Sequence, residues 1–239
     1  MANIEYPKVA HGRICYVEIP AQDINISSAF YQKIFGWNIR TRSDGRIAFD
    51  DGIGKVSGTW VQGREPAAQP GLIVSIMVDD IEATMQAIIS AGCSIVNKIQ
   101  IGETEFVAWF ADPAGNVLGL YQHPGGGHGK ICYLEIPAAD INKSVEFYKA
   151  IFPWQIRSDN HGNAAFDDVI GNVSGMWAGH VKPAPSGLVV YTMVDSVAET
   201  VEKIVAHGGA IVKPPRGNSK EDDAIFSDPE GNIMGIGQE

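Results

Sequence analysis

Hydrophobic and polar positions along the chain alternate between a strand period and a helix period. Residues 14–19 carry β-branched and aromatic side chains at alternate positions, which is typical of a strand. Asp23 then suits the N-cap of a helix that ends near residue 36. The apolar face of that helix is expected to carry Ile26, Phe30 and Ile34. Short strands are expected at 37–42, 47–50 and 56–61.

The same order restarts at residue 72. A strand over 72–78 precedes a helix near 80–91, with Asp80 as its cap and Gly92 after its end. Three further strands are expected around 94–99, 105–110 and 116–122. Since strands outnumber helices and follow one another directly, the pattern predicts an α+β fold with mixed sheets.

The whole pattern then occurs a second time. Residues 11–61 align without a gap on residues 128–178, and 31 of these 51 positions are identical. Such identity indicates duplication and fusion. We expect a first domain at 1–122, a glycine-rich link at 123–128 and a second domain at 129–239, so that the chain holds four βαβββ units.

These motifs resemble the glyoxalase, bleomycin-resistance and extradiol-dioxygenase superfamily, also called vicinal oxygen chelate proteins. The resemblance rests on Asp23, Phe30-Tyr31, Phe35-Gly36-Trp37, Val78-Asp79-Asp80 and Asp112-Pro113, and on their second-copy equivalents. It covers nearly the whole chain. It implies two glyoxalase-like domains with curved mixed sheets, in which two βαβββ units surround one site per copy. The paired copies would resemble a covalent form of the family's dimer.

The family's metal-ligand positions carry unsuitable residues in this sequence. Metal-dependent relatives place His, Gln or Glu there, whereas the corresponding positions here are occupied by tyrosine, an aliphatic residue and glycine. In copy order they are Tyr16, Ile73 and Gly119, then Tyr133, Val189 and Gly235. A fourth position falls near Gly58 and Gly175. Aliphatic residues and glycine offer no side-chain donor, and neutral tyrosine is a poor ligand, so we expect neither a metal nor another cofactor.

Strand parity gives the candidate ligand-binding residues. Tyr16 and Glu18, with Tyr133 and Glu135 in the second copy, should face the pocket and are candidate acid–base groups. Alternatively, each carboxylate lies at the pocket mouth, hydrogen-bonded to a neighbouring strand or to an arginine such as Arg40 or Arg157. The other predicted lining residues are Trp60, Ile73, Ser75, Gly119, Tyr121, Trp177, Val189, Tyr191 and Gly235. Either tryptophan could instead pack in the core.

The copies differ where specificity would reside. Ser75 corresponds to Tyr191, and Tyr121 to Gly237; the segment 106–109 is aromatic, whereas 222–225 contains two aspartates. One pocket should therefore be more apolar than the other.

Other chemically capable residues favour structural interpretations. His11 and His128 precede the first strands, where entry or interface roles are expected. Cys15 and Cys132 should face the helix as small apolar groups. The pairs Asp50-Asp51 and Asp167-Asp168 are expected to be solvated hairpin ends.

Composition narrows the partners. The chain has 239 residues, 45% of them hydrophobic, and a net charge of −10, which disfavours nucleic acid and membrane surfaces. No signal-like segment opens the chain, and three cysteines argue against a disulfide framework, so a cytoplasmic location is expected. The fused copies could form an internal pseudo-dimer, and either a monomer or a homodimer is compatible with that.

Three functions are compatible with these features. The leading one is metal-independent binding of a small organic ligand, as in the bleomycin-resistance members. The second is an enzyme, either a lyase or isomerase of lactoylglutathione-lyase type, or a metal-free acid–base catalyst. The third is a structural protein with collapsed pockets.

Overall fold

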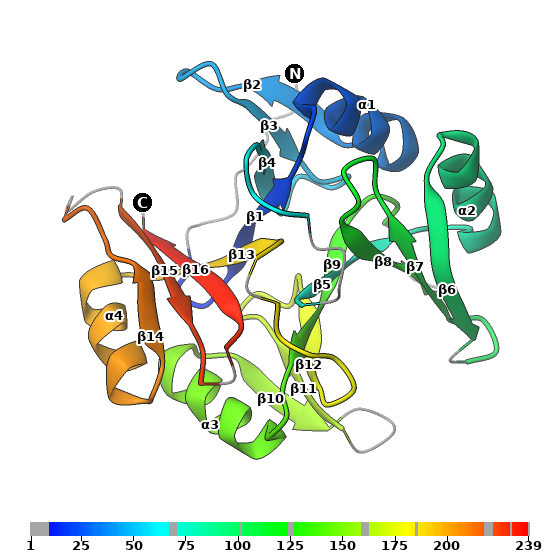
Figure 1. Cartoon of the computed structure of the whole chain (residues 1–239). Helices are drawn as coiled ribbons and strands as arrows, with labels where there is room; N and C mark the ends of the chain where they lie inside the picture. The colour runs from blue at the N-terminus through cyan, green and yellow to red at the C-terminus, as the bar shows by residue number, and fades with distance from the viewer. Residues whose placement is uncertain are drawn as a thin grey trace.

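In the computed structural model, the chain forms four βαβββ units arranged in two eight-stranded sheets (Figure 1). The structure describes residues 10–66, 71–100, 102–123, 127–158, 163–184, 186–217, 222–229 and 231–238. Half of the predicted glycine-rich link, residues 124–126, lies outside them. The expected α+β class is confirmed.

The first copy contains two helices and eight strands. They are β1 (Ile14–Pro20), α1 (Ile24–Phe35), β2 (Asn38–Thr41), β3 (Ile47–Asp50), β4 (Ser57–Val61), β5 (Ile73–Met77), α2 (Ile81–Ser90), β6 (Ser94–Gln100), β7 (Phe106–Ala111) and β8 (Val117–Gln122). Each agrees with its sequence prediction to within a residue or two.

The second copy repeats this order. Its elements are β9 (Ile131–Pro137), α3 (Ile141–Ile151), β10 (Gln155–Ser158), β11 (Ala164–Asp167), β12 (Ser174–Ala178), β13 (Val189–Met193), α4 (Val197–Ala206), β14 (Ala210–Lys213), β15 (Asp222–Ser227) and β16 (Ile233–Gln238).

Local chemistry accounts for the helix ends. The Asp23 carboxylate accepts hydrogen bonds from the backbone N–H groups of Asn25 and Ile26. Gly36, at φ 66°, closes α1 in the left-handed conformation that glycine adopts without a Cβ clash. One helix prediction was wrong: Ile26 is 58% exposed, because the buried face begins one residue later, at Ser27.

The sheets are shared between the copies. Sheet A has the order β14-β15-β16-β13-β1-β4-β3-β2, and sheet B has the order β10-β11-β12-β9-β5-β8-β7-β6. The central contacts are antiparallel pairings of β1 with β13 and of β5 with β9. Each sheet thus combines one unit from each copy. The expectation that two units of one copy would surround one site was wrong.

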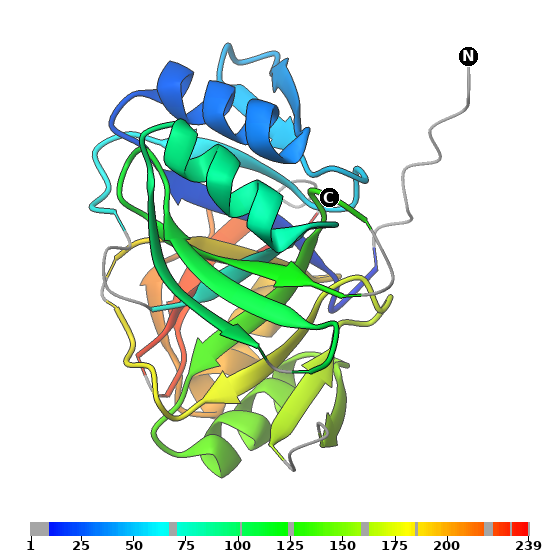
Figure 2. The same cartoon turned by 90° about the vertical axis from the view of Figure 1, so that its right-hand side faces the viewer.

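Within each copy, the two units pack through their helices rather than through one sheet. Helices α1 and α2 lie side by side (Figure 2). The Tyr31 hydroxyl donates to the Asp112 carboxylate at 3.0 Å, and the Asn116 side chain donates to the Pro20 carbonyl at 2.6 Å. Tyr148, Asp228 and Asn232 repeat these contacts. The Phe-Tyr and Asp-Pro motifs therefore hold units together.

A network of buried aromatic rings fills the space between helices and sheets. In the first copy, the ring of Trp37 stacks on Phe49 at 4.2 Å and on Tyr31 at 4.5 Å. Trp60 is 3% exposed and packs against Phe49 in the same core, and Trp177 is fully buried in the equivalent place. The prediction that these two tryptophans line a pocket was wrong, since they lie on the helix-facing side of β4 and β12.

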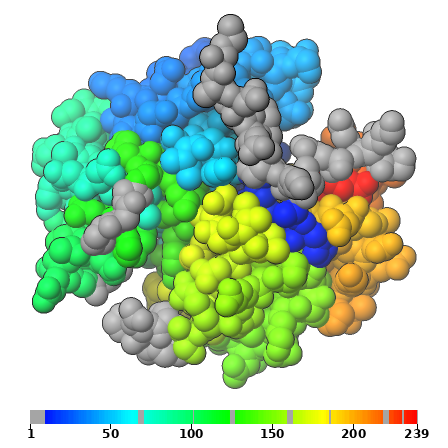
Figure 3. Space-filling view, turned by 180° about the vertical axis from the view of Figure 1, so that it is seen from behind, coloured from blue at the N-terminus to red at the C-terminus, as the bar shows by residue number. Residues whose placement is uncertain are grey.

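The copies interlock through reciprocal contacts at the strand entries. The indole N–H of Trp37 donates to the Gly129 carbonyl, and that of Trp154 to the Gly12 carbonyl, each at 2.7 Å. His128 bonds to the Ile34 carbonyl, which confirms its expected interface role. In Figure 3, the first described residues (dark blue) lie beside both yellow-green and orange segments of the second copy.

Asp51 and Asp168 also join the copies. The Asp51 carboxylate accepts from the N–H of Ile131 at 2.9 Å, and Asp168 accepts from the N–H of Ile14 at 3.2 Å. Both aspartates are nearly fully buried. The prediction of solvated hairpin ends was wrong for these two, although Asp50 and Asp167 do form partly exposed ion pairs with Arg40 and Arg157.

Removing the Asp51 carboxylate should destabilise the fold. It also accepts from the N–H groups of Lys55 and Val56, and each buried donor left without a partner costs about 1–3 kcal/mol. We expect Asp51→Ala to lower the free energy of unfolding by about 3 kcal/mol or more in urea denaturation, with partial recovery in Asp51→Asn. The surface control Asp50→Ala should lose less than about 1 kcal/mol. Equal effects would contradict the linking role.

Candidate binding sites on the two shared sheets

The predicted site residues collect on the sheet faces that are turned away from the helices, here called the open faces. Tyr16 and Glu18 are half-buried there, whereas Ile73, Ser75, Val189 and Tyr191 are buried. Val17, Ile19 and Val190 belong to the core, so the alternating residues of the same strands point the other way. Two groups result. Site A comprises Tyr16, Glu18, Val189, Tyr191 and Gly235 on sheet A. Site B comprises Ile73, Ser75, Gly119, Tyr121, Tyr133 and Glu135 on sheet B.

This grouping corrects the expected one. Tyr16 was expected beside Ile73 and Gly119 of its own copy, but it pairs with Tyr191 of the second copy. Tyr133 in turn lies opposite Ser75 of the first copy. The sequence motifs identify the residues that face a site. They do not identify which strands pair with each other, because that pairing depends on long-range packing between the repeated units.

A bulge at the start of β1 changes one further assignment. The register shifts between Ile14 and Tyr16, and β9 has the equivalent irregularity. Ile14 therefore packs in the core instead of sharing a face with Tyr16. The thiols of Cys15 and Cys132 bond to carbonyls of the neighbouring strands. Burial raises the pKa of Tyr121 on the open face, and Glu105 and then Cys132 add to the shift. The prediction that these cysteines face the helix was wrong.

Site A is built around aromatic rings and charged pairs. The rings of Tyr16 and Tyr191 meet edge to face at 5.9 Å. Arg42 donates to the Tyr16 hydroxyl at 3.3 Å, and Arg64 forms an ion pair with Glu18. The predicted partners of Glu18, Arg40 and Arg157, were wrong. Burial raises the pKa of both tyrosines, while Arg42 opposes the shift at Tyr16. Both phenols are therefore neutral hydrogen-bonding groups near pH 7.

Site B is more apolar. Ile73 packs with Ala178, Val181 and Trp109 in a small cluster separate from the main core. Tyr121 lies 6.3 Å from Tyr133 between ring centroids. Gly119 is required here, because a Cβ at this position would overlap the Ser75 side chain.

Glu135 is the unusual group of site B. It is 9% exposed, and burial raises its pKa to about 7. Among the described residues, its ion-pair neighbour is the exposed His180, at 3.8 Å between Nε2 and Oε2. Glu18 and Glu135 occupy equivalent positions, yet Val181 stands where the first copy has Arg64. The signal is present in the sequence, because the repeat continues without a gap from Val61 and Ala178 to Arg64 and Val181.

The donor set does not fit a divalent metal. At the family's ligand positions, site A offers Tyr16, Val189 and Gly235, and site B offers Tyr133, Ile73 and Gly119. In the part of the chain that the structure describes, no three His, Cys, Asp or Glu side chains gather closely enough to hold an ion. Tyrosine with aliphatic residues and glycine does not supply the oxygen and nitrogen donors that such ions require.

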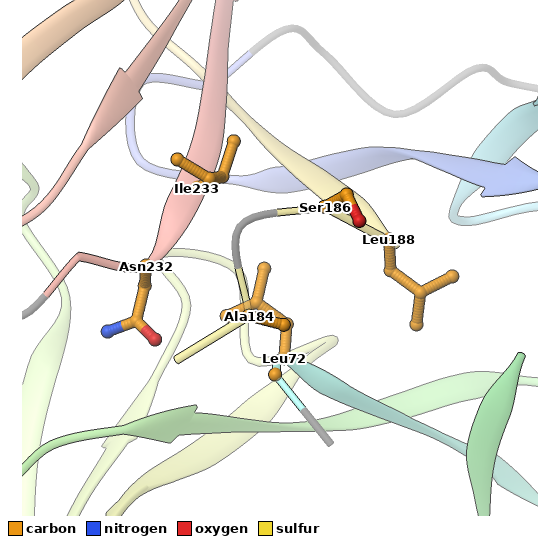
Figure 4. A pocket seen from close by; sticks show the side chains of 7 residues that line it. Leu72, Ala184, Ser186, Leu188, Asn232 and Ile233 are labelled. Atoms are coloured by element: carbon orange, nitrogen blue, oxygen red, sulfur yellow. The ribbon is translucent and has the colours of Figure 1, made fainter. Parts of the chain in front are cut away.

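A crevice elsewhere in the molecule does not extend either site. It lies where the starts of β5, β13 and β16 meet, and it has room for no more than about one water molecule (Figure 4). Leu72, Ala184 and Asn232 are among its lining residues, and it shares no residue with site A or site B.

The chain belongs to the Glyoxalase/Bleomycin resistance protein/Dioxygenase superfamily, whose profile matches residues 13–120 and 130–235. It is 24% identical to "Putative glyoxylase CFP32" of Mycobacterium bovis, over 92% of each chain. It is also 28% identical to a "Glyoxylase-like domain-containing protein" of Didymella fabae, over 49% of this chain and 98% of that one.

Among solved structures, glyoxalase I from Zea mays superposes with a TM-score of 0.73 at 17% identity, covering 95% of this chain and 92% of that one. This likeness establishes the fold. Among the described residues, no helix is long and apolar enough to cross a bilayer.

The buried carboxyl of Glu135 should make stability depend on pH. Its pKa is about 7 in the folded protein and about 4.5 when unfolded, so folding favours the protonated form. Below about pH 4.5 the group is protonated in both states and does not change the free energy of unfolding. As the pH rises to 7, its burial lowers the free energy of unfolding by roughly 3 kcal/mol. We expect Glu135→Gln to melt several degrees above wild type at pH 8, with the difference vanishing near pH 4.

Glu18→Gln provides the matched control, because Glu18 is paired with Arg64. It should show no such gain at pH 8. A wild-type-like melting curve for Glu135→Gln across this pH range would mean that Glu135 is hydrated or otherwise paired.

Proposed function

We propose that the protein binds small organic ligands on the open faces of the two shared sheets, without a divalent metal ion. The supporting observation is the composition of these faces. Each face carries aromatic rings, neutral phenols and one glutamate, and the positions that bind the metal in metal-dependent relatives hold no set of chelating side chains. Such apolar surfaces with a few oriented polar groups are typical of small-molecule sites.

Aromatic side chains are the expected source of binding free energy. Tyr16 and Tyr191 border site A, and Tyr121, Tyr133 and Trp109 border site B. A planar ligand between such rings gains stacking and removes apolar surface from water. In this proposal the neutral hydroxyls orient the ligand. An internal pseudo-dimer is the expected assembly, and the cytoplasmic location expected from sequence stays a prediction.

A second candidate function rests on Glu135. Its carboxyl lies two residues from Tyr133 on β9 and is shielded from water. With a pKa of about 7, it has the properties of a general base near neutral pH. Metal-free acid–base chemistry would therefore belong to site B. Glu18, held by Arg64, is less suited to accept a proton.

Binding is tested with the neutral fluorophore N-phenyl-1-naphthylamine and the anionic fluorophore 1-anilinonaphthalene-8-sulfonate. We expect at least one to bind with micromolar affinity and to raise the melting temperature, equally with and without EDTA. A ligand at a hundredfold excess over its Kd adds about 2.7 kcal/mol of stability. The site variants are Tyr16→Ala with Tyr191→Ala, and Tyr121→Ala with Tyr133→Ala; Ile89→Ala, on the exposed face of α2, is the control.

Two results would overturn the proposal. One is failure of both probes to bind at millimolar concentration. The other is binding that EDTA abolishes and a stoichiometric transition metal restores.

Acid–base activity is tested by proton exchange. A bound carbon acid incubated in D2O should incorporate deuterium, with a rate that rises through pH 7 and is lost in Glu135→Gln. The Glu18→Gln protein should retain exchange. Exchange that persists in Glu135→Gln would exclude Glu135 as the base.

A further inference from the structure

The two sites differ in charge. Four basic side chains lie around site A: Arg42 and Arg46 from the β2–β3 hairpin, Arg64 after β4, and Lys213 at the end of β14. Three carboxylates, Asp44, Glu18 and Asp223, form ion pairs with them, and Asp223 also acts on Tyr191. Arg42 bonds to Tyr16, and both Tyr16 and Glu18 interact electrostatically with Arg46. These positive groups gather on a protein whose net charge is −10.

The equivalent positions around site B carry no basic residue. In the repeat alignment, Arg42 corresponds to Asp159, Arg46 to Asn163, Arg64 to Val181 and Lys213 to Asn97. Of these four, Asp159 lies outside the described residues. The ionisable groups recorded next to site B include His180 beside Glu135, Glu105 and Cys132 near Tyr121, and His123 beside Glu105.

We propose that site A selects an organic anion, held through Arg64 and Arg42, whereas site B rejects anions and takes neutral apolar ligands. This inference rests on the proposed small-molecule function and adds the ligand's charge class to it.

Arg64 is placed to serve as the main anion contact. Its side chain is 21% exposed and Glu18 is 19% exposed, so the pair lies in the wall of the site and not out in bulk water. An arginine there can present further N–H donors to a carboxylate, sulfonate or phosphate while it still contacts Glu18. Partial burial strengthens the attraction by reducing solvent screening.

Arg42 supplies the second contact. Its guanidinium donates a hydrogen bond to the Tyr16 hydroxyl, at the edge of the Tyr16–Tyr191 ring pair. Its carboxylate neighbour is Asp44, with 3.8 Å between Nε of Arg42 and Oδ2 of Asp44. Asp44 lies closer to Arg46, at 2.7 Å, so Arg42 is the less neutralised of the two arginines. A planar ligand on Tyr16 and Tyr191 could therefore direct its anionic group toward Arg42 and Arg64 together.

Glu18 makes the proposal sharply testable. Its carboxylate competes with an anionic ligand for Arg64 and repels that ligand. Glu18→Gln should therefore tighten anion binding, whereas Arg64→Val, which installs the residue of the second copy, should weaken it. If the ion pair merely supported the fold, both changes would weaken binding and lower the melting temperature.

The experiment compares the two naphthalene fluorophores, which share a skeleton and differ by the sulfonate. We expect Arg64→Val and Arg42→Gln each to raise the Kd of the anionic probe at least tenfold, with less than a twofold change for the neutral probe. Glu18→Gln should lower the anionic Kd at least threefold. Added salt should weaken the anionic probe selectively.

The reciprocal change is made in site B. Val181→Arg should give site B measurable affinity for the anionic probe, weaker than that of site A because site B has no equivalent of Arg42, and melting temperatures of all variants monitor folding. The proposal is overturned if the anionic Kd is unchanged in Arg64→Val and Arg42→Gln, or if Glu18→Gln weakens binding. Binding of the neutral probe alone would overturn only the charge assignment, whereas binding of neither probe would overturn the proposed function as well.

Discussion

The antiparallel pairing of β1 with β13 and of β5 with β9 is the constraint on which the rest of the structure depends. A strand with an unpaired edge leaves its N–H and C=O groups without partners, and such an edge must be completed or covered. Here the edge of each unit is completed by a unit of the other copy. Both candidate sites lie across these two seams, so each combines residues from both halves of the chain.

The arrangement explains why the duplicated motifs are where they are. Within a copy, Tyr31 and Asp112 join the two units back to back, which directs their sheets away from each other. Between copies, Asp51 caps the start of β9 and Asp168 caps the start of β1. These buried carboxylates accept hydrogen bonds from several backbone N–H groups, including the first N–H of the neighbouring copy's strand. They thereby fix where that strand begins. The recurring residues Tyr31, Asp51 and Asp112 therefore serve packing, and Tyr16 and Glu18 recur in the sites as Tyr133 and Glu135. The basic residues Arg42, Arg64 and Lys213 occur around site A alone.

Much of this could be predicted from the sequence. Local chemistry is sufficient to predict the strand and helix bounds, including the Asp23 cap and the helix end at Gly36. Most of these local signals occur in both copies. The family was identified by the resemblance of its motifs, which also gave positions such as Ile73 and Gly119, and strand parity placed Glu18 on the face of Tyr16. Partner choice did not, because Tyr16 could meet Ser75 or Tyr191 with equally good alternation, and only packing among four units decides between them.

Two further features were beyond local patterns. The prediction for Trp60 was wrong because it was tied to the face of Gly58, and a Cβ at Gly58 would overlap the core ring of Phe49. Ser57 and Thr59 have the opposite parity. The charge difference between the sites depends on Arg64, which lies in a loop after the strand and reaches Glu18 only in the folded protein. Once that contact is known, its replacement by Val181 explains why two equivalent carboxylates, Glu18 and Glu135, have different surroundings.

The shared sheets are tested most directly by cross-strand nuclear Overhauser effects in the isotope-labelled full-length protein. The account predicts contacts between the backbone protons of Val17 and Val190, and between those of Val74 and Leu134, which are register partners across the two seams. Contacts of β1 with β5 in place of these would show that each copy closes its own sheet, and would contradict the account.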